Sequence, residues 1–229
     1  MNALYTAGSP HEKIAFVGEA PGAEEERCGG AFVGKAGQLL TELLQHAGLN
    51  RGQCYFDNVF QFRPPRNDIA PFLRVQEGKT RESSEYHEHK EGLRQRLENC
   101  KANVIVALGN VPLYALTGKA NITKQRGSIL ESTLLPGRKV IPVIHPSAAL
   151  REFLYRYYIV NDLTRVRKEA ESPEINLLER NLVLNPSMKD VEEFIEHCRS
   201  LPRIAYDIEV KGMELSHLAI APAPDFAMC

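Results

Sequence analysis

Five side chains of complementary chemistry follow short apolar runs of this sequence: a carboxylate, an aromatic ring, a primary amide, a cation and an imidazole. They are Glu19, Phe32, Asn58, Arg63 and His145. Proteins that act on a nucleobase stack the flipped base on an aromatic ring and read its polar edge with hydrogen bonds. An asparagine amide matches the O4 and N3–H edge of uracil, and a histidine near O2 stabilises the charge that forms as the N-glycosidic bond breaks. The combination predicts a pocket for a flipped base.

Each of these residues also has an ordinary structural explanation. Phe32 is of a type that most often belongs to the core, Asn58 is of a type that often forms a turn or a cap, and His145 before Pro146 can simply end a strand. The prediction of a base pocket therefore rests on their occurring together.

A glycine-rich loop, GEAPGAEEERCGGAFVGKAG, follows the apolar run KIAFV. Gly29, Gly34 and Lys35 match the first positions of the phosphate-binding pattern GxxxxGK[ST], but Ala36 replaces the hydroxyl residue that would hold magnesium. The pattern also begins well after the predicted strand ends, so the required strand, turn and helix are missing. We therefore expect the loop to approach a nucleoside and not a nucleotide triphosphate.

Apolar runs typical of strands alternate with helical patterns, which predicts how these side chains are positioned. The runs are KIAFV, CYFDNVFQF, NVIVALG and KVIPVIHP. Four leucines at helical spacing predict a helix from Gln38 to His46, and we expect a short helix after Pro112 and one long helix over residues 147–170. Because parallel strands need crossover connections, this order predicts an α/β fold around a central parallel sheet. Ligands bind at the carboxyl ends of such strands, where the loops with the five side chains would meet.

The segment between Asp68 and Glu98 is polar and charged, and it predicts a solvated loop that leads into an exposed helix. His87 and His89 are spaced as in a loop and not as in a helical zinc pair. We therefore expect no metal at these histidines.

Composition narrows the class of protein. The 229 residues are 43% hydrophobic with a formal net charge of −1, so any contact with nucleic acid must come from local basic patches. The 5 cysteines show no CxxC spacing, which argues against a zinc ribbon or a disulfide framework and predicts reduced thiols. The sequence shows no secretory signal pattern and no apolar run long enough for a bilayer, so we expect a cytoplasmic protein without membrane contact.

Several separated motifs resemble, in order and spacing, the family 4 uracil-DNA glycosylases over about residues 14–168. They are GEAPGAEEERCGGAFVGKAGQLL, DNVFQFRPPRN, NVIVALG, RGSIL and HPSAALR. Agreement of several motifs in order is far more specific than one short pattern. The resemblance implies the three-layer α/β fold of the uracil-DNA glycosylases and an enzyme that hydrolyses the N-glycosidic bond of uracil in DNA by base flipping.

The resemblance also implies roles for individual residues. Phe32 would stack on the uracil, Asn58 would read its edge and His145 would stabilise the departing base. The residues expected to line the base are Gly18, Ala20, Phe32, Asn58 and His145. Glu19 and Glu25 would organise the attacking water. The residues expected to contact DNA are Arg63, Pro146, Ser147 and Arg151.

Two departures from related glycosylases affect these expectations. Family 4 enzymes carry a four-cysteine iron–sulfur cluster, with two ligands ahead of the first motif and a third just before RPP, where this chain has no cysteine before Cys28 and has Phe62 before Arg63. We therefore expect no cofactor in this domain and apolar packing by FQF. Glycosylases with a GQDPYH motif place an aspartate where this chain has Ala20, so water activation would rest on Glu19, Glu25 or the electrostatics of the leaving anion. The KRRIH motif of the variant that crosslinks to uracil is absent as well, so no covalent trapping is expected.

The C-terminal stretch RIAYDIEV resembles the first motif of the DnaQ-like 3′–5′ exonucleases of family A DNA polymerases. Asp207 and Glu209 are two residues apart, which places both carboxylates on one face of a strand, as a two-metal site with Mg²⁺ or Mn²⁺ requires. The other acidic motifs are absent, so this part would be inactive alone.

These features predict three segments: a uracil-DNA glycosylase-like domain over residues 1–170, a linker over 171–180, and the beginning of an exonuclease-like domain over 181–229. The chain would be the N-terminal portion of a phage-like DNA polymerase, acting on uracil-containing DNA in the cytoplasm of a bacterial host. Two alternatives remain: a non-catalytic uracil- or DNA-binding module that positions the polymerase on its template, and a domain that only holds the exonuclease in place.

Overall fold

The computed structural model describes residues 5–75, 80–177 and 180–229. The chain forms two compact units, Met1–Ile175 and Asn176–Cys229. Residues 76–79 of the predicted charged loop and 178–179 of the predicted linker lie outside the described residues, and the predicted boundaries at 170 and 181 stay predictions.

A five-stranded sheet in the order β2-β1-β5-β7-β6 forms the centre of the first unit. Its parallel strands are β1 (Ile14–Gly18), β2 (Tyr55–Asn58), β5 (Val104–Leu108) and β7 (Lys139–Val143), and β6 (Leu130–Glu131) runs antiparallel to β7. Every residue of the four parallel strands is buried. Continuous burial of this kind indicates that helices cover both faces of the sheet.

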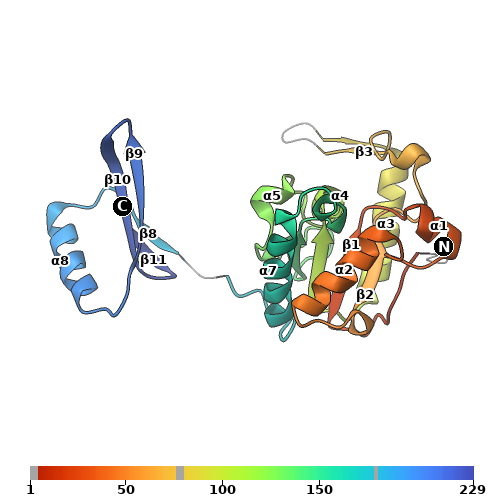
Figure 1. The fold of residues 1–229 in the computed structure, drawn as a ribbon, viewed down its shortest axis with the longest axis horizontal. Helices are drawn as coiled ribbons and strands as arrows, with labels where there is room; N and C mark the ends of the chain where they lie inside the picture. Colours follow the sequence, from red (N-terminus) through yellow and green to blue (C-terminus); the bar gives the residue numbers. More distant parts are fainter. Residues whose placement is uncertain (1–4, 76–79, 178–179) are drawn as a thin grey trace. The chain divides into compact units, whose positions relative to one another are not determined.

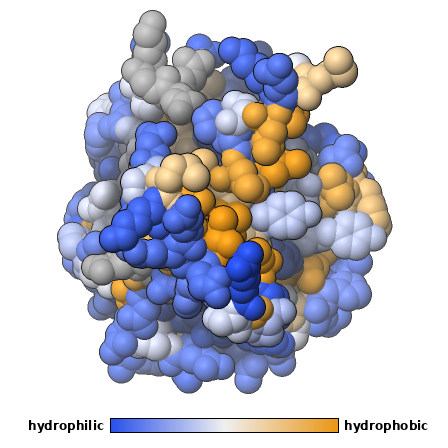
Figure 2. Space-filling model, turned by 90° about the vertical axis from the view of Figure 1, so that its left-hand side faces the viewer, coloured by the Kyte–Doolittle hydropathy of each residue, from blue (hydrophilic) through white to orange (hydrophobic). Residues whose placement is uncertain are grey.

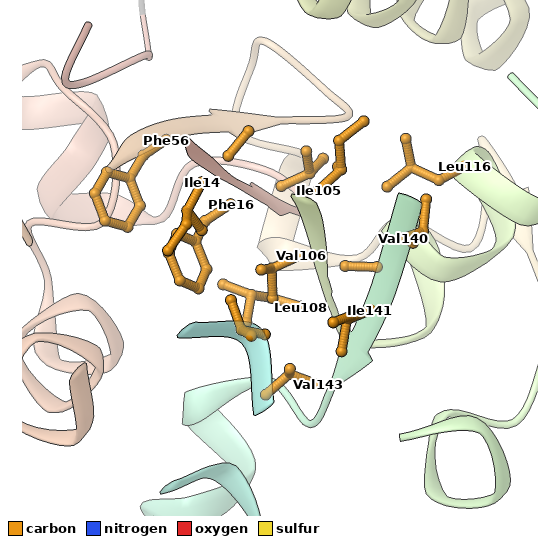
Figure 3. Packing of buried hydrophobic residues seen from close by; sticks show 14 of the residues in the cluster. Ile14, Phe16, Phe56, Ile105, Val106, Leu108, Leu116, Val140, Ile141 and Val143 are labelled. Carbon is orange, nitrogen blue, oxygen red and sulfur yellow. The ribbon is translucent and has the colours of Figure 1, made fainter. Parts of the chain in front are cut away.

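Helices form the two outer layers (Figure 1). α2 (Lys35–His46) and α7 (Leu154–Glu169) pack together on one face, and α3 (Ser84–Glu98) and α4 (Asn110–Thr117) lie on the other. Figure 3 shows the apolar core around β1, β5 and β7, where Phe16 lies beside Phe56 with ring centroids 5.2 Å apart. The predicted α/β fold around a central, mostly parallel sheet is thus confirmed.

Shorter elements complete this unit. They are α1 (Ala23–Cys28), α5 (Ile122–Gln125), α6 (Pro146–Ala149), the 3-10 helices η1 (Arg51–Gln53) and η2 (Pro65–Asn67), and the antiparallel pair β3 (Leu73–Arg74) and β4 (Arg81–Glu82). α1 lies within the glycine-rich segment, which the sequence analysis treated as a loop throughout.

Three local predictions were wrong. β2 ends at Asn58 and not near Phe62, because the Gln61 side chain folds back and donates to the Asn58 carbonyl (3.1 Å). The single helix predicted over residues 147–170 is divided into α6 and α7. His87 and His89 lie within α3 and not in a loop, and the His89 ring packs 5.1 Å from that of Phe62.

The second unit contains a four-stranded sheet and one helix. The strand order is β8-β11-β10-β9, with β8 (Asn181–Val183), β9 (Ala205–Lys211), β10 (Glu214–Ala223) and β11 (Phe226–Met228). Ser187 caps the helix α8 (Met188–Arg199), whose Phe194 packs on Phe226 at 5.7 Å. All of β9 is exposed, including Tyr206, Ile208 and Val210, and the surface in Figure 2 shows exposed apolar residues gathered in a patch.

Candidate active site

The carboxyl ends of β1, β2 and β7 bring three of the predicted side chains together. Gly18 at the end of β1 pairs with Asn58 at the end of β2. A Cβ atom on Gly18 would lie 2.5 Å from Asn58 Oδ1 and 2.6 Å from Phe32 Cζ, so both side chains lie directly over this glycine. The Phe32 ring is in turn 6.3 Å from the His145 ring. Phe32, Asn58 and His145 therefore lie next to one another at this edge of the sheet, as the sequence predicted for the loops that meet there.

Asn58 is the polar centre of this site. Asn58 is only 3% exposed to solvent. Within the described part of the chain its amide makes no hydrogen bond, although its backbone groups make several. The donor and acceptor of this amide, at the end of a strand, are therefore both free to pair with a ligand.

Phe32 is held in an unusual backbone conformation. It has φ = 55° and is 7% exposed. A positive φ is costly for a residue with a bulky side chain and is found where the surroundings enforce it. Gly37 provides the room, because a Cβ atom there would lie only 1.9 Å from the Phe32 carbonyl oxygen. The ring is thus placed before any ligand binds.

Glu25 holds the same loop. Its carboxylate is buried and accepts the backbone N–H groups of Gly22 (3.1 Å), Val33 (2.8 Å) and Gly34 (2.8 Å). Most of its acceptor capacity is therefore used by the backbone on either side of Phe32. This placement favours a role in fixing the loop over the predicted role in organising water.

Glu19 is the carboxylate that remains available. It is half-buried, and within the described residues its side chain makes no hydrogen bond or ion pair. Burial raises the pKa of Glu19 above its usual range, and the negative charge of Asp68 raises it further. A raised pKa in a pocket is typical of a general base, and Ala20 beside it adds no second acid.

His145 is positioned by the helix that follows β7. It caps α6, and its Nδ1 accepts the backbone N–H of Ser147 at 3.2 Å. Burial and, to a smaller extent, the charge of Arg151 together lower the pKa of His145 to about 4 against the opposing effect of Glu25. The ring is therefore neutral near pH 7. The Ser147 hydroxyl lies 2.8 Å from the same Nδ1, and an Nδ1 that accepts from the Ser147 N–H assigns the ring proton to Nε2. A neutral Nε2–H is a hydrogen-bond donor that carries no charge.

The predicted DNA-contacting residues lie around this edge with different exposures. Arg63 donates to Glu26 (2.9 Å) and to Asn67 (2.8 Å), so intramolecular partners hold its guanidinium. Pro146, the first residue of α6, is buried, Ser147 is half-buried, and Arg151 is exposed. Asp207 and Glu209 belong to the other unit, where they are exposed on β9 opposite Ala219 and His217 of β10.

The residues available for an iron–sulfur cluster do not fit one. Among the described residues, no group of three or more His, Cys, Asp or Glu side chains is placed to hold a metal ion. Phe62 packs instead against Phe72 (5.2 Å) and His89 (5.1 Å). Cys54 is buried, and burial raises the pKa of its thiol to about 12, far from the thiolate that iron requires.

We expect the purified protein to contain no iron–sulfur cluster, because aromatic rings fill the space next to Arg63. The absorption spectrum should lack the broad cluster band at about 400 nm, and iron should be absent by elemental analysis. Iron that copurifies in stoichiometric amounts and is lost with that band on oxidation would contradict this expectation.

We expect Gly18→Ala to impair the site without unfolding the protein. The new methyl group would lie within 2.6 Å of both Asn58 and Phe32 and would displace them. A displacement of about 1 Å at reacting groups can cost about 10²-fold in rate. Gly52→Ala is the matched control, because its Cβ would meet nothing closer than Asn50 Oδ1 at 3.4 Å. Equal activity of the two variants would show that Gly18 does not border the site.

The sequence does not reveal the residues behind Asn58. Asp57, Gln61 and Arg96 form a buried network on the backbone of that residue. An aspartate inside an apolar strand run was the available signal for Asp57. Arg96 lies 39 residues further along the chain in a segment rich in charged residues, so no local pattern distinguishes it.

In residues 5–75, 80–177 and 180–229, no helix has both the length and the apolar character to cross a bilayer.

Comparison with known proteins gives consistent matches. The profile of the uracil DNA glycosylase superfamily matches residues 5–188. A type-4 uracil-DNA glycosylase of Thermotoga maritima is 40% identical over 152 residues, which cover 66% of this chain and 72% of that protein. One from Archaeoglobus fulgidus is 36% identical over 155 residues, 64% of this chain and 72% of that protein. A DNA polymerase of Bacillus phage SP01 is 29% identical over 157 residues, 68% of this chain but 16% of the polymerase.

Proposed function

The chain belongs to the uracil DNA glycosylase superfamily, and on this basis we propose that it excises uracil from DNA by hydrolysing the N-glycosidic bond of a flipped nucleotide. The observation that carries the proposal is the Asn58 amide, which has no hydrogen-bond partner among the described residues and lies with the Phe32 ring over Gly18, next to which stands the His145 imidazole. The names of the relatives support the same substrate.

In the proposed reaction each side chain has one task. Phe32 stacks on uracil, and the Asn58 amide donates to O4 and accepts from N3–H. The bond between C1′ and N1 breaks, and its electron pair leaves with uracil as an anion. Nε2–H of His145 donates to O2, where the negative charge accumulates. Water then forms the new bond to C1′, and Glu19 accepts its proton.

Contacts with DNA are proposed for the loop after β7. The exposed Arg151 is suited to a phosphate, and Pro146 and Ser147 place the loop backbone near the minor groove. Arg63 would have to exchange its contact with Glu26 for a phosphate, which is feasible because this ion pair is partly exposed and therefore weak.

Uracil-containing DNA tests the proposed activity. Incubation with single- or double-stranded oligonucleotides followed by alkali should cleave the strand at uracil, and Asn58→Ala should slow excision strongly while leaving a residual rate that single-turnover reactions can measure. The presence of Ala20 in place of an aspartate favours a second candidate function, a uracil-binding module without catalysis. That candidate is correct if alkali reveals no cleavage while uracil still strengthens binding to DNA and Asn58→Ala removes the preference.

We further propose that this domain is part of a DNA polymerase, with the beginning of a 3′–5′ exonuclease-like domain over residues 181–229. The match to the phage polymerase supports this context, and the host cytoplasm would then be its location. Asp207 and Glu209 would bind Mg²⁺ or Mn²⁺ only together with further acidic residues. The exposed apolar side chains of β9 are suited to packing against additional structure. The reading frame in the source genome tests this proposal, since it should encode the remaining acidic motifs and a polymerase domain.

A further inference from the structure

Behind Asn58 lies a buried hydrogen-bond network centred on Asp57. The Asp57 carboxylate is 0% exposed and accepts hydrogen bonds from the Asn58 N–H (2.7 Å), Gln61 Nε2 (2.8 Å), the Tyr55 hydroxyl (3.2 Å) and Arg96 Nε (2.7 Å). The acceptor capacity of this carboxylate is therefore fully used within the protein. Asp57 does not face the base site, and its task must be internal.

Arg96 connects this carboxylate to the backbone of Asn58. Its Nη2 donates to the Asn58 carbonyl at 3.0 Å, and Gln61 Nε2 donates to the same oxygen at 3.1 Å. Asp57 holds the N–H of Asn58 while Arg96 and Gln61 hold its C=O. Both peptide groups of Asn58 are thus fixed, and only its side-chain amide is left for a ligand.

We propose that Arg96 is a positioning residue that sets the Asn58 amide for recognition of uracil, a role that rests on the proposed function. The planar guanidinium binds a carboxylate and a carbonyl at once in a fixed geometry, which an ammonium group cannot do. Arg96 is on α3 and Asn58 is on β2, so the position of the helix determines the orientation of Asn58.

Stability alone is a poor explanation for this arrangement. A buried ion pair is often no more stabilising than well-packed apolar residues of similar volume. Burial raises the pKa of Asp57, and Arg96 is the strongest influence opposing that rise. The side chain at this position must both compensate the charge of Asp57 and orient Asn58, and an arginine can do both.

A double-mutant cycle tests the proposal. Arg96→Lys keeps a cation for Asp57 but loses the fixed fork, and it should lower the single-turnover excision rate about tenfold. In an Asn58→Ala background the same change should cost less than about twofold, because residues that act through one another are not additive. Arg94→Lys is the matched control on the same helix, since Arg94 pairs with Glu91 and Glu98 at the surface, and its rate should equal that of the wild type.

The outcomes separate this inference from the proposed function. Losses that multiply across the cycle would mean that Arg96 acts only on stability, and the inference fails while the glycosylase activity stands. If the wild type does not excise uracil, the proposed activity fails, and the same cycle is run on the binding preference for uracil- over thymine-containing DNA. Absence of any preference overturns both. If Arg96→Lys unfolds in thermal denaturation, Gln61→Met removes the second donor to the Asn58 carbonyl and takes its place in the cycle.

Discussion

Replacing His145 with leucine should lower the excision rate about 10²- to 10³-fold, the usual effect of removing one donor to a developing oxyanion. The imidazole is already neutral near pH 7, since burial lowers its pKa to about 4, and its Nε2–H faces no partner among the described residues. Binding of DNA that already lacks the base should change little. Single-turnover kinetics on a uracil-containing duplex, with binding to abasic DNA measured in parallel, checks both statements.

The pH dependence of stability gives this variant a second readout. The unfolded chain takes up a proton on His145 near pH 6.5, whereas the folded protein does so only near pH 4. The folded state therefore loses stability as the pH falls from about 6.5 to about 4, and His145→Leu should reduce that acid sensitivity. His46→Leu, at an exposed histidine on α2, is the control and should leave the rate unchanged. Full activity of His145→Leu would remove the imidazole from the mechanism.

Replacing Glu19 with glutamine should lower the excision rate about 10²- to 10⁴-fold, because the attacking water loses its base. A base must be deprotonated to act, so the rate should fall as the pH falls through the raised pKa of Glu19. That acid limb should disappear in Glu19→Gln. Rate measurements from pH 4 to 8 test this directly.

Asp68→Asn offers a sharper test of the same assignment. The negative charge of Asp68 contributes to the raised pKa of Glu19, so its removal should move the acid limb to lower pH and leave the plateau rate unchanged. A plateau rate in Glu19→Gln equal to that of the wild type would instead mean that water attacks without a base. The electrostatics of the leaving anion would then carry the reaction.

The sequence was sufficient for the central sheet and for the site because both depend on strong local signals. β1 and β5 are continuous apolar runs, and the loops after parallel strands must meet at one edge of the sheet. The sequence therefore predicts that Asn58 and His145 lie close together. Periodicity misled only where the apolar residues do not pack. Leu150 and Phe153 continue the helical spacing of α7 but are 50% and 61% exposed, and the chain breaks there into α6 and α7.

The rest of the site depends on contacts between distant parts of the chain. Glu25 has the same residue type as its neighbours Glu24 and Glu26, and only the fold distinguishes it, by placing two backbone N–H groups beyond Phe32 against its carboxylate. Arg96 is one of several cations on α3, and nothing in its neighbourhood indicates that it reaches Asn58. No local pattern encodes such pairings, which appear only when strand and helix are in place.

The loop that carries Phe32 has a kinetic consequence. Glu25 and Gly37 fix its backbone in advance, so the protein has little left to order when DNA arrives. The entropic cost of forming the complex then falls on the nucleotide that must leave its stack. Encounter with DNA would therefore be limited by how often the strand itself exposes a base. Mismatched or unpaired uracil would therefore bind beside Phe32 sooner than uracil in a stable pair. The rate at which the enzyme finds uracil would follow the rate of spontaneous base opening in the DNA.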